Sequence, residues 1–138
     1  MSQANKDLFQ RWFDEVWTQG RAEAIDEMLT ADTVIHGLAD TSGNPISDPG
    51  KFREFHKQFC GAFPDIAITV EDMVAEGDRV AGRCSVRAKH SGDHLGIAAT
   101  NADVEITGMA FIRVEDGKVV EAWNNFDFLK LNQQLGVL

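Results

Sequence analysis

The chain has 138 residues, enough for a single domain, residues 1–138, with a substantial core. Its net charge of −9 argues against nucleic acid and against an anionic membrane surface as partners, because both attract clustered positive charge. No apolar run approaches the roughly 20 residues of a membrane span, and the opening MSQANKDLFQ lacks the basic and apolar parts of a signal peptide. We therefore expect a cytoplasmic location and no membrane association.

The N-terminal part predicts two helices that are separated at Gly20. In the first helix, apolar residues recur at helical spacing. They are Leu8, Phe9, Trp12, Phe13, Val16 and Trp17. Such an aromatic stripe suits plain core packing and also suits the wall of a ligand cavity. Within this stripe, Trp12 is the residue that we expect to contact a substrate.

The next segment, Thr33 to Leu38, predicts a short strand that carries His36. His36 shares a face with Val34 and Leu38, so we expect its ring to point inward. Burial disfavours the charged imidazolium, and a buried neutral histidine needs a hydrogen-bond partner. The residue is either a satisfied structural histidine or part of a pocket.

A third helix follows a loop rich in turn-forming residues. Asp48 and Pro49 form a typical helix start, and the helix is expected to end near Ala62, before Phe63-Pro64. Its apolar stripe consists of Phe52, Phe55, Phe59 and Phe63. His56 lies beside this stripe, where it either borders the interior or is half exposed. Phe59 and His56 are further candidates for substrate contact.

Three alternating runs then predict the strands 66–75, 79–90 and 103–115. The first run is expected to face inward through Ile66, Ile68, Val70 and Val74. The second faces inward through Val80, Gly82, Cys84, Val86, Ala88 and His90, and the third through Val104, Ile106, Ala110, Ile112 and Val114. His90 ends its row where the strands open into the connection 91–102, a position typical of functional rims.

The outer face of the third run carries Met109 and Phe111, which are apolar groups that need covering. A second subunit would cover them, so we expect a homodimer or a higher homo-oligomer. The cysteines Cys60 and Cys84 lack metal-type spacing and are expected to be reduced thiols. The four histidines also lack paired ligand spacing, so no metal and no cofactor is expected.

The last strand begins after the turn Asp116-Gly117, a strong signal for a two-residue hairpin. Alternation from Lys118 to Asp127 places one set of residues on a common face. That set is Val119, Glu121, Trp123, Asn125 and Asp127. A carboxylate beside large apolar groups at a strand end suits acid–base chemistry. Asp127 alternatively caps a terminal helix that begins at Phe128.

Helices that precede a run of strands indicate an α+β fold with an antiparallel meander. We expect a strongly curved sheet with the N-terminal helices packed over its concave face, which leaves a pocket between the two layers. No repeat or second domain is visible.

A set of motifs, taken in chain order, carries a family resemblance over nearly the whole chain. These motifs are WFDEVWTQGRAEAIDEM (12–28), His36, Phe63-Pro64-Asp65, EGDRV (76–80), His90 with Gly92 and Gly96, Gly108, 115–121, Trp123, Asp127 and Gln134-Leu135-Gly136. The chain resembles the SnoaL-like polyketide cyclases, within the nuclear-transport-factor-2-like or ketosteroid-isomerase-like superfamily.

The resemblance implies a cone-shaped α+β barrel with a deep apolar pocket. It also implies ring closure on a polyketide ester by intramolecular aldol condensation, without metal or cofactor. The family's acid–base aspartate maps onto Asp127, and its pocket histidines map onto His36 and His90. The rim loop departs from the pattern at Ala98-Ala99 and Asn101-Ala102, where proline and glycine are expected, and this leaves the substrate fit open.

The residues allow the same chemistry. Asp127, with its pKa raised by apolar walls such as Trp123, would exchange the proton beside a carbonyl. His36, His90 or Asn125 would hydrogen-bond the oxyanion. Two alternatives are a binding protein for an apolar small molecule without turnover and a hydrolase of the limonene-epoxide-hydrolase type. The hydrolase needs a second carboxylate and an inward arginine, whereas the arginines fall mainly on outward positions.

Overall fold

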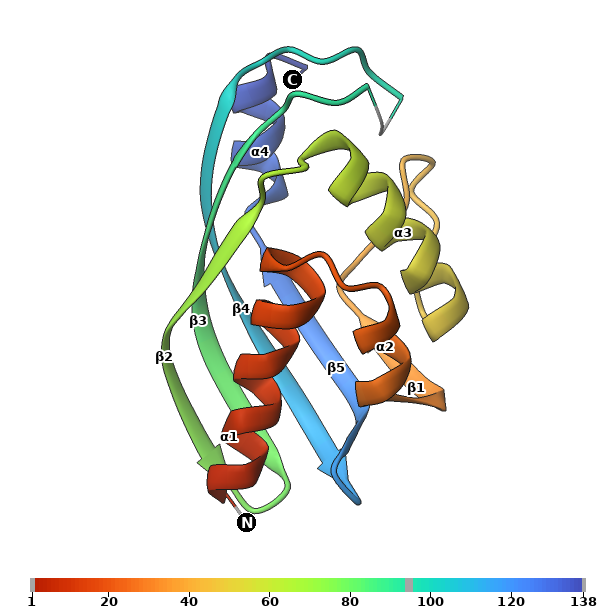
Figure 1. Cartoon of the computed structure of the whole chain (residues 1–138), viewed down its shortest axis with the longest axis vertical. Coiled ribbons are helices and arrows are strands. Elements are labelled where there is room, and N and C mark those ends of the chain that lie inside the picture. The colour runs from red at the N-terminus through yellow and green to blue at the C-terminus, as the bar shows by residue number, and fades with distance from the viewer. Residues whose placement is uncertain (1, 94–95, 138) are drawn as a thin grey trace.

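The computed structural model describes residues 2–93 and 96–137, and its helices cover one face of a curved sheet (Figure 1). The five strands are hydrogen-bonded in the order β1-β5-β4-β3-β2. Strands β1 and β2 are therefore the edges, and within the described residues the sheet is open rather than closed into a barrel. The predicted α+β class is confirmed, with helices across the concave side. In the same two ranges, no helix is long and apolar enough to cross a membrane.

The order of elements agrees with the sequence prediction. The helical elements are α1 (Ser2–Arg11), the π-helix η1 (Trp12–Thr18), α2 (Glu23–Met28), α3 (Pro49–Ala62) and α4 (Phe128–Leu135). The strands are β1 (Leu29–His36), β2 (Ala67–Glu76), β3 (Arg79–Lys89), β4 (Asp103–Glu115) and β5 (Lys118–Phe126). Strands β2 to β5 form the predicted antiparallel meander, and β1 pairs with β5 in parallel. Strand β1 begins earlier than the predicted Thr33.

Strand pairing is regular between β3 and β4 and is interrupted toward the edges of the sheet. Strands β3 and β4 pair without a break. On β5, Val120 is an extra residue between Val119 and Glu121, and on β2 Glu71 is extra in the same way. An extra residue reverses the face on which all later side chains lie. For this reason Val74, which was expected to face inward, is 68% exposed.

Two glycines on the concave face of the sheet make room for aromatic rings. A Cβ at Gly82 would lie only 2.4 Å from the ring of Phe9, so glycine at this position lets α1, which carries the fully buried Phe9, pack closely on β3. A Cβ at Gly108 would lie 2.2 Å from the ring of Phe126 on the neighbouring strand β5, so glycine there lets this ring lie across β4.

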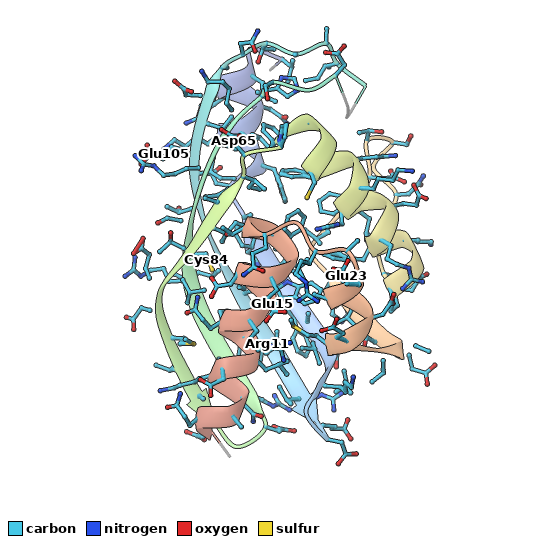
Figure 2. The ribbon with its side chains drawn as sticks, in the orientation of Figure 1. Arg11, Glu15, Glu23, Asp65, Cys84 and Glu105 are labelled. Atoms are coloured by element: carbon cyan, nitrogen blue, oxygen red, sulfur yellow. The ribbon has the colours of Figure 1, made fainter. Side chains whose placement is uncertain are left out.

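Helix α4 continues the sheet where β5 ends. The side-chain amide of Gln134 donates to the carbonyl of Glu105 at 3.0 Å and accepts from the N–H of Glu105 at 3.0 Å. These two bonds replace those of a neighbouring strand on β4. The side chain of Glu105 lies on the outer side of the sheet, away from the helices (Figure 2). Helix α4 then ends at Gly136, whose φ of 75° is the usual left-handed helix end.

Candidate functional site

An apolar cavity lies between the inward side chains of the sheet and those of the helices. Its lining comes from the five strands and from α1, η1, α3 and α4. The cavity has a volume of about 70 Å³, which is room for several water molecules. Among its described lining side chains, only Asn124 offers a hydrogen-bond acceptor, and the others are apolar apart from the indole N–H groups of Trp12 and Trp17. The arrangement suits a compact apolar ligand with one polar group.

Aromatic rings from η1 and α3 form the cavity wall opposite the sheet. Trp17 contacts Phe52, Phe55 and Phe59 edge-on, with ring centroids 5.9, 6.1 and 5.7 Å apart. Trp12 packs on Phe52 at 5.3 Å. Two predicted substrate-contacting residues, Trp12 and Phe59, therefore line the cavity while also packing in the core.

His56 lies behind this aromatic wall and outside the cavity lining. The prediction of a half-exposed ring was wrong, because His56 is only 3% exposed. Its Nε2 lies 2.6 Å from the carbonyl oxygen of Val16. A carbonyl only accepts, so Nε2 donates. His56 is thus a satisfied structural histidine that ties α3 to η1.

His36 lies on the outer face of the sheet, and the expectation that it points inward was wrong. In the second half of β1 the buried side chains are Thr33 and Ile35, whereas Val34 and His36 are exposed. Thr33 fixes this register, because its hydroxyl donates to the carbonyl of Val119 at 2.6 Å. His36 therefore belongs to the opposite row of alternating side chains.

On that outer face His36 takes part in a charged cluster with Trp123. The imidazole stacks on Trp123, with centroids 5.3 Å apart and planes 15° apart. Its Nε2 is 2.8 Å from Oε2 of Glu121, and Arg113 is 3.3 Å from Oε1 of the same carboxylate. These hydrogen bonds lower the pKa of Glu121, and the hydrogen bond with His36 is the largest cause. Trp123 and the exposed Asn125 are thus outside the cavity, contrary to their predicted role.

Asp127 lies just beyond β5 as the cap of α4. Its Oδ1 accepts from the N–H of Lys130 at 3.0 Å. The residue is exposed and is not part of the cavity lining, although its neighbours Phe126 and Phe128 are. The capping interpretation is therefore confirmed. Because Asp127 is exposed, its carboxylate is not enclosed by apolar walls as expected.

His90 is fully buried, as its place in the inward row of β3 predicts. Its ring lies 5.2 Å from that of Phe63 and does not line the cavity. Nδ1 accepts the N–H of Thr100 at 3.1 Å, so the ring proton of the neutral form is on Nε2. Within the described residues Nε2 has no hydrogen-bond partner. His90 therefore anchors the connection after β3 instead of facing the cavity.

Asn124 is the cavity residue that the sequence prediction missed. The bulge at Val120 turns Ala122, Asn124 and Phe126 inward in place of Trp123 and Asn125. The adjacent apolar pair Val119-Val120 is the only local signal of this reversal. Regular alternation alone selects the wrong row.

The described residues contain no group of three or more histidines, cysteines or acidic residues placed to hold a metal ion. The two cysteines are free thiols, as predicted. Burial, together with the charge of Glu71, raises the pKa of Cys84 to about 11. Cys84 is therefore a poor nucleophile and packs as a core residue.

Residues 7–135 match the family model of the SnoaL-like polyketide cyclases. The chain belongs to this family. Its fold agrees with this membership, because solved structures described as polyketide cyclases superimpose on nearly the whole chain. No curated protein sequence matches it.

Three solved structures show the extent of the similarity. IdmH from Streptomyces antibioticus, a candidate polyketide cyclase, is 33% identical with a TM-score of 0.81, over 96% of this chain and 99% of that one. AclR from Streptomyces galilaeus, a candidate hydroxylase, is 28% identical with a TM-score of 0.86, over 100% and 84% of the two chains. A SnoaL-like protein from Jannaschia sp. CCS1 is 20% identical with a TM-score of 0.83, over 99% and 94%, and shares the fold.

Proposed function

We propose that this chain is a small-molecule cyclase that closes a ring on an apolar carbonyl compound held in the cavity. The supporting observation is a cavity whose described lining consists of aliphatic and aromatic side chains and Asn124. Such walls favour a hydrocarbon-rich ligand and remove water from it. Membership of the polyketide cyclase family supports ring formation as the reaction.

The proposed reaction is an intramolecular aldol closure without metal or cofactor. A base removes a proton beside one carbonyl, and the enolate carbon bonds to a second carbonyl carbon of the same molecule. The oxygen of that second carbonyl then takes up a proton, so nothing is oxidised or reduced. The narrow cavity contributes by holding the two reacting carbons together, an effect that reaches about 7–11 kcal/mol in favourable systems.

Asp127 is the acid–base residue in this proposal. It stands between two lining residues, Phe126 and Phe128, at the end of β5. Its Oδ1 caps α4, while its Oδ2 has no hydrogen-bond partner among the described residues and is able to accept a proton. The role requires a substrate that extends past the lining toward the start of α4.

A second candidate function is the binding of an apolar ligand without turnover. One observation favours it: across residues 2–93 and 96–137, the lining contains no titratable side chain. The same observation disfavours epoxide hydrolysis, which needs carboxylates and an arginine in the cavity.

Linear polyketone thioesters of increasing length provide the test, with ring closure followed by chromatography. We expect acceleration by the wild type that survives EDTA. Ala110 lines the cavity, so Ala110→Leu should fill it and lower the rate at least tenfold. Met109→Leu is the matched control on the outer face and should keep the rate. Tight binding without acceleration would favour the second function, and an unchanged rate in Ala110→Leu would contradict catalysis in the cavity.

We also propose that the protein is a homodimer through the outer face of β4 and β5. Met109 and Phe111 are 60% and 36% exposed there, and Phe111 packs edge-on against Trp123 at 5.5 Å. Exposed apolar groups of this kind are typical of subunit contacts. A monomeric mass at micromolar concentration in sedimentation equilibrium would contradict the proposal.

A further inference from the structure

We propose that Asn124 determines ligand specificity in the cavity by accepting a hydrogen bond from a hydroxyl or enol group of the ligand. The inference rests on the proposed function, because it assumes that an apolar ligand occupies the cavity. It adds the substrate class: a compact apolar molecule that carries one hydroxyl or enol at a fixed place.

Among the described lining residues, Asn124 is the one whose side chain offers a hydrogen-bond acceptor, because the indoles of Trp12 and Trp17 only donate. It lies on β5 between the inward residues Ala122 and Phe126, and it is half-buried. Across the cavity stand the aromatic rings of η1 and α3, which offer no strong acceptor. Within the described lining, the side chain of Asn124 is therefore the one acceptor that a ligand hydroxyl can approach.

The amide of Asn124 has a defined orientation. One side-chain atom lies 3.0 Å from the backbone carbonyl oxygen of His36. That carbonyl only accepts, so the atom facing it must be the NH₂ nitrogen, Nδ2. Oδ1 is consequently directed away from His36. Among the described residues no donor bonds to Oδ1, so it remains free to accept from a ligand.

Gly37 holds the two strands close enough to keep this orientation. Its φ of +88° favours glycine, and a Cβ there would lie 1.9 Å from the backbone oxygen of Asn124. The end of β1 therefore rests directly on the backbone of Asn124, next to the paired residues His36 and Trp123. This contact fixes the carbonyl that orients the amide.

An acceptor in apolar surroundings discriminates between ligands. A ligand with a donor satisfies Oδ1, whereas an otherwise equal apolar ligand removes water from Oδ1 and leaves it without a partner. Sites that hydrogen-bond a hydroxyl reject analogues that lack one much more strongly than they reject a change in size. The enol form of a carbonyl compound provides such a donor beside the carbon that reacts in an aldol closure.

Phenol and toluene provide the test, because they share a shape and differ by hydroxyl against methyl. The quantity measured is the ratio of their dissociation constants, by NMR titration, in the wild type and in Asn124→Leu. Comparing the ratio between proteins cancels the different hydration of the two probes. We expect Asn124→Leu to shift the ratio toward toluene by roughly five- to tenfold, the scale of one net hydrogen bond. Asn125→Leu, on the outer face of the same strand, should leave the ratio unchanged.

An unchanged ratio in Asn124→Leu would overturn the inference while leaving the apolar cavity as a binding site. Failure of both probes to bind the wild type would overturn the proposed function and the inference together. Should Asn124→Leu fail to fold, the side-chain amide resonances of Asn124 in the wild type decide the matter. Phenol should shift them and toluene should not, and equal shifts would contradict the inference.

Discussion

Strands β3 and β5 lie on either side of β4, and they present their side chains to the cavity in different ways. Strand β3 pairs with β4 without interruption, and its inward residues Val80, Gly82, Cys84 and Val86 are all buried. Strand β5 contains the extra residue Val120, so its inward row changes along its length. Before the bulge Val119 is inward, and after it Ala122 and Asn124 are.

The difference shows how one unpaired residue separates two kinds of polar group. The bulge keeps Glu121 outside, where it bonds to His36 and Arg113, and it brings the neutral amide of Asn124 inside. Uninterrupted alternation would have placed a carboxylate in the apolar cavity. The bulge thus keeps the cluster of Glu121, His36 and Arg113 on the outer face and places the amide of Asn124 on the cavity face.

The largest expected effect is on stability, when a charge introduced on the cavity face of β4 is compared with a charge on its outer face. Ala110 is 5% exposed on the cavity face, and Met109 is 60% exposed on the outer face. Ala110→Asp should cost about 3–5 kcal/mol in the free energy of unfolding, because the carboxylate is buried without a partner. Met109→Asp should leave the subunit folded and weaken the proposed dimer. Urea unfolding and sedimentation would measure both, and a similar loss of stability in the two variants would contradict the inside–outside assignment.

The next effect concerns the contact between β1 and β5. Gly37→Ala should cost about 1–3 kcal/mol, because it combines a left-handed backbone with a collision against Asn124. Gly43→Ala is the matched control, since Gly43 has a similar φ of +84° but open space around it. Gly37→Ala should also reduce the preference for phenol over toluene. Equal losses of stability in the two variants would show that the contact with Asn124 contributes nothing.

Substitutions of Asp127 distinguish its capping role from a catalytic role. Asp127→Ala should lower the free energy of unfolding by about 1 kcal/mol through loss of the cap, whereas Asp127→Asn should preserve it. If Asp127 is also the acid–base group, Asp127→Asn should lower ring closure on the order of 10² or more. Full turnover in Asp127→Asn would leave Asp127 with the capping role alone.

The smallest effect is the pH dependence that arises from the outer face. The pKa of Glu121 is lowered in the folded protein, so its stabilising contribution is present above the ordinary value of 4.5 and is lost as the pH falls through the folded pKa. Glu121→Gln should therefore make stability fall less steeply below pH 4.5. His36→Gln, which removes the largest cause of the shift, should act in the same direction. Parallel acid limbs in wild type and Glu121→Gln would contradict the assignment.

Much of the fold was predictable because its signals are local. Asp48 caps α3 through the N–H of Lys51, as the Asp-Pro sequence indicates. Asp116 and Gly117 have φ values of 51° and 75°, the conformation that the predicted hairpin turn requires. The inward rows of β3 and β4 also followed from alternation, because no bulge interrupts their pairing.

The site was harder to predict, because it depends on pairing between distant segments. Whether Trp123 or Asn124 faces the cavity is decided by the pairing of β4 with Glu121 beyond Val120. The inward face of β1 is decided by Thr33, which bonds to a residue far along the chain. Neither contact leaves a periodic signal in its own segment, so the prediction chose the wrong row on both strands.

The aromatic wall of the cavity also has an optical consequence. Of the three tryptophans, Trp12 and Trp17 line the cavity, while Trp123 stacks on His36 at the outer surface. Indole emission responds to the polarity of its surroundings and to contact with quenching groups. In a Trp123→Phe variant all of the remaining emission would come from indoles at the cavity. The intrinsic fluorescence of that variant would then follow the filling and emptying of the cavity in real time, without any attached dye.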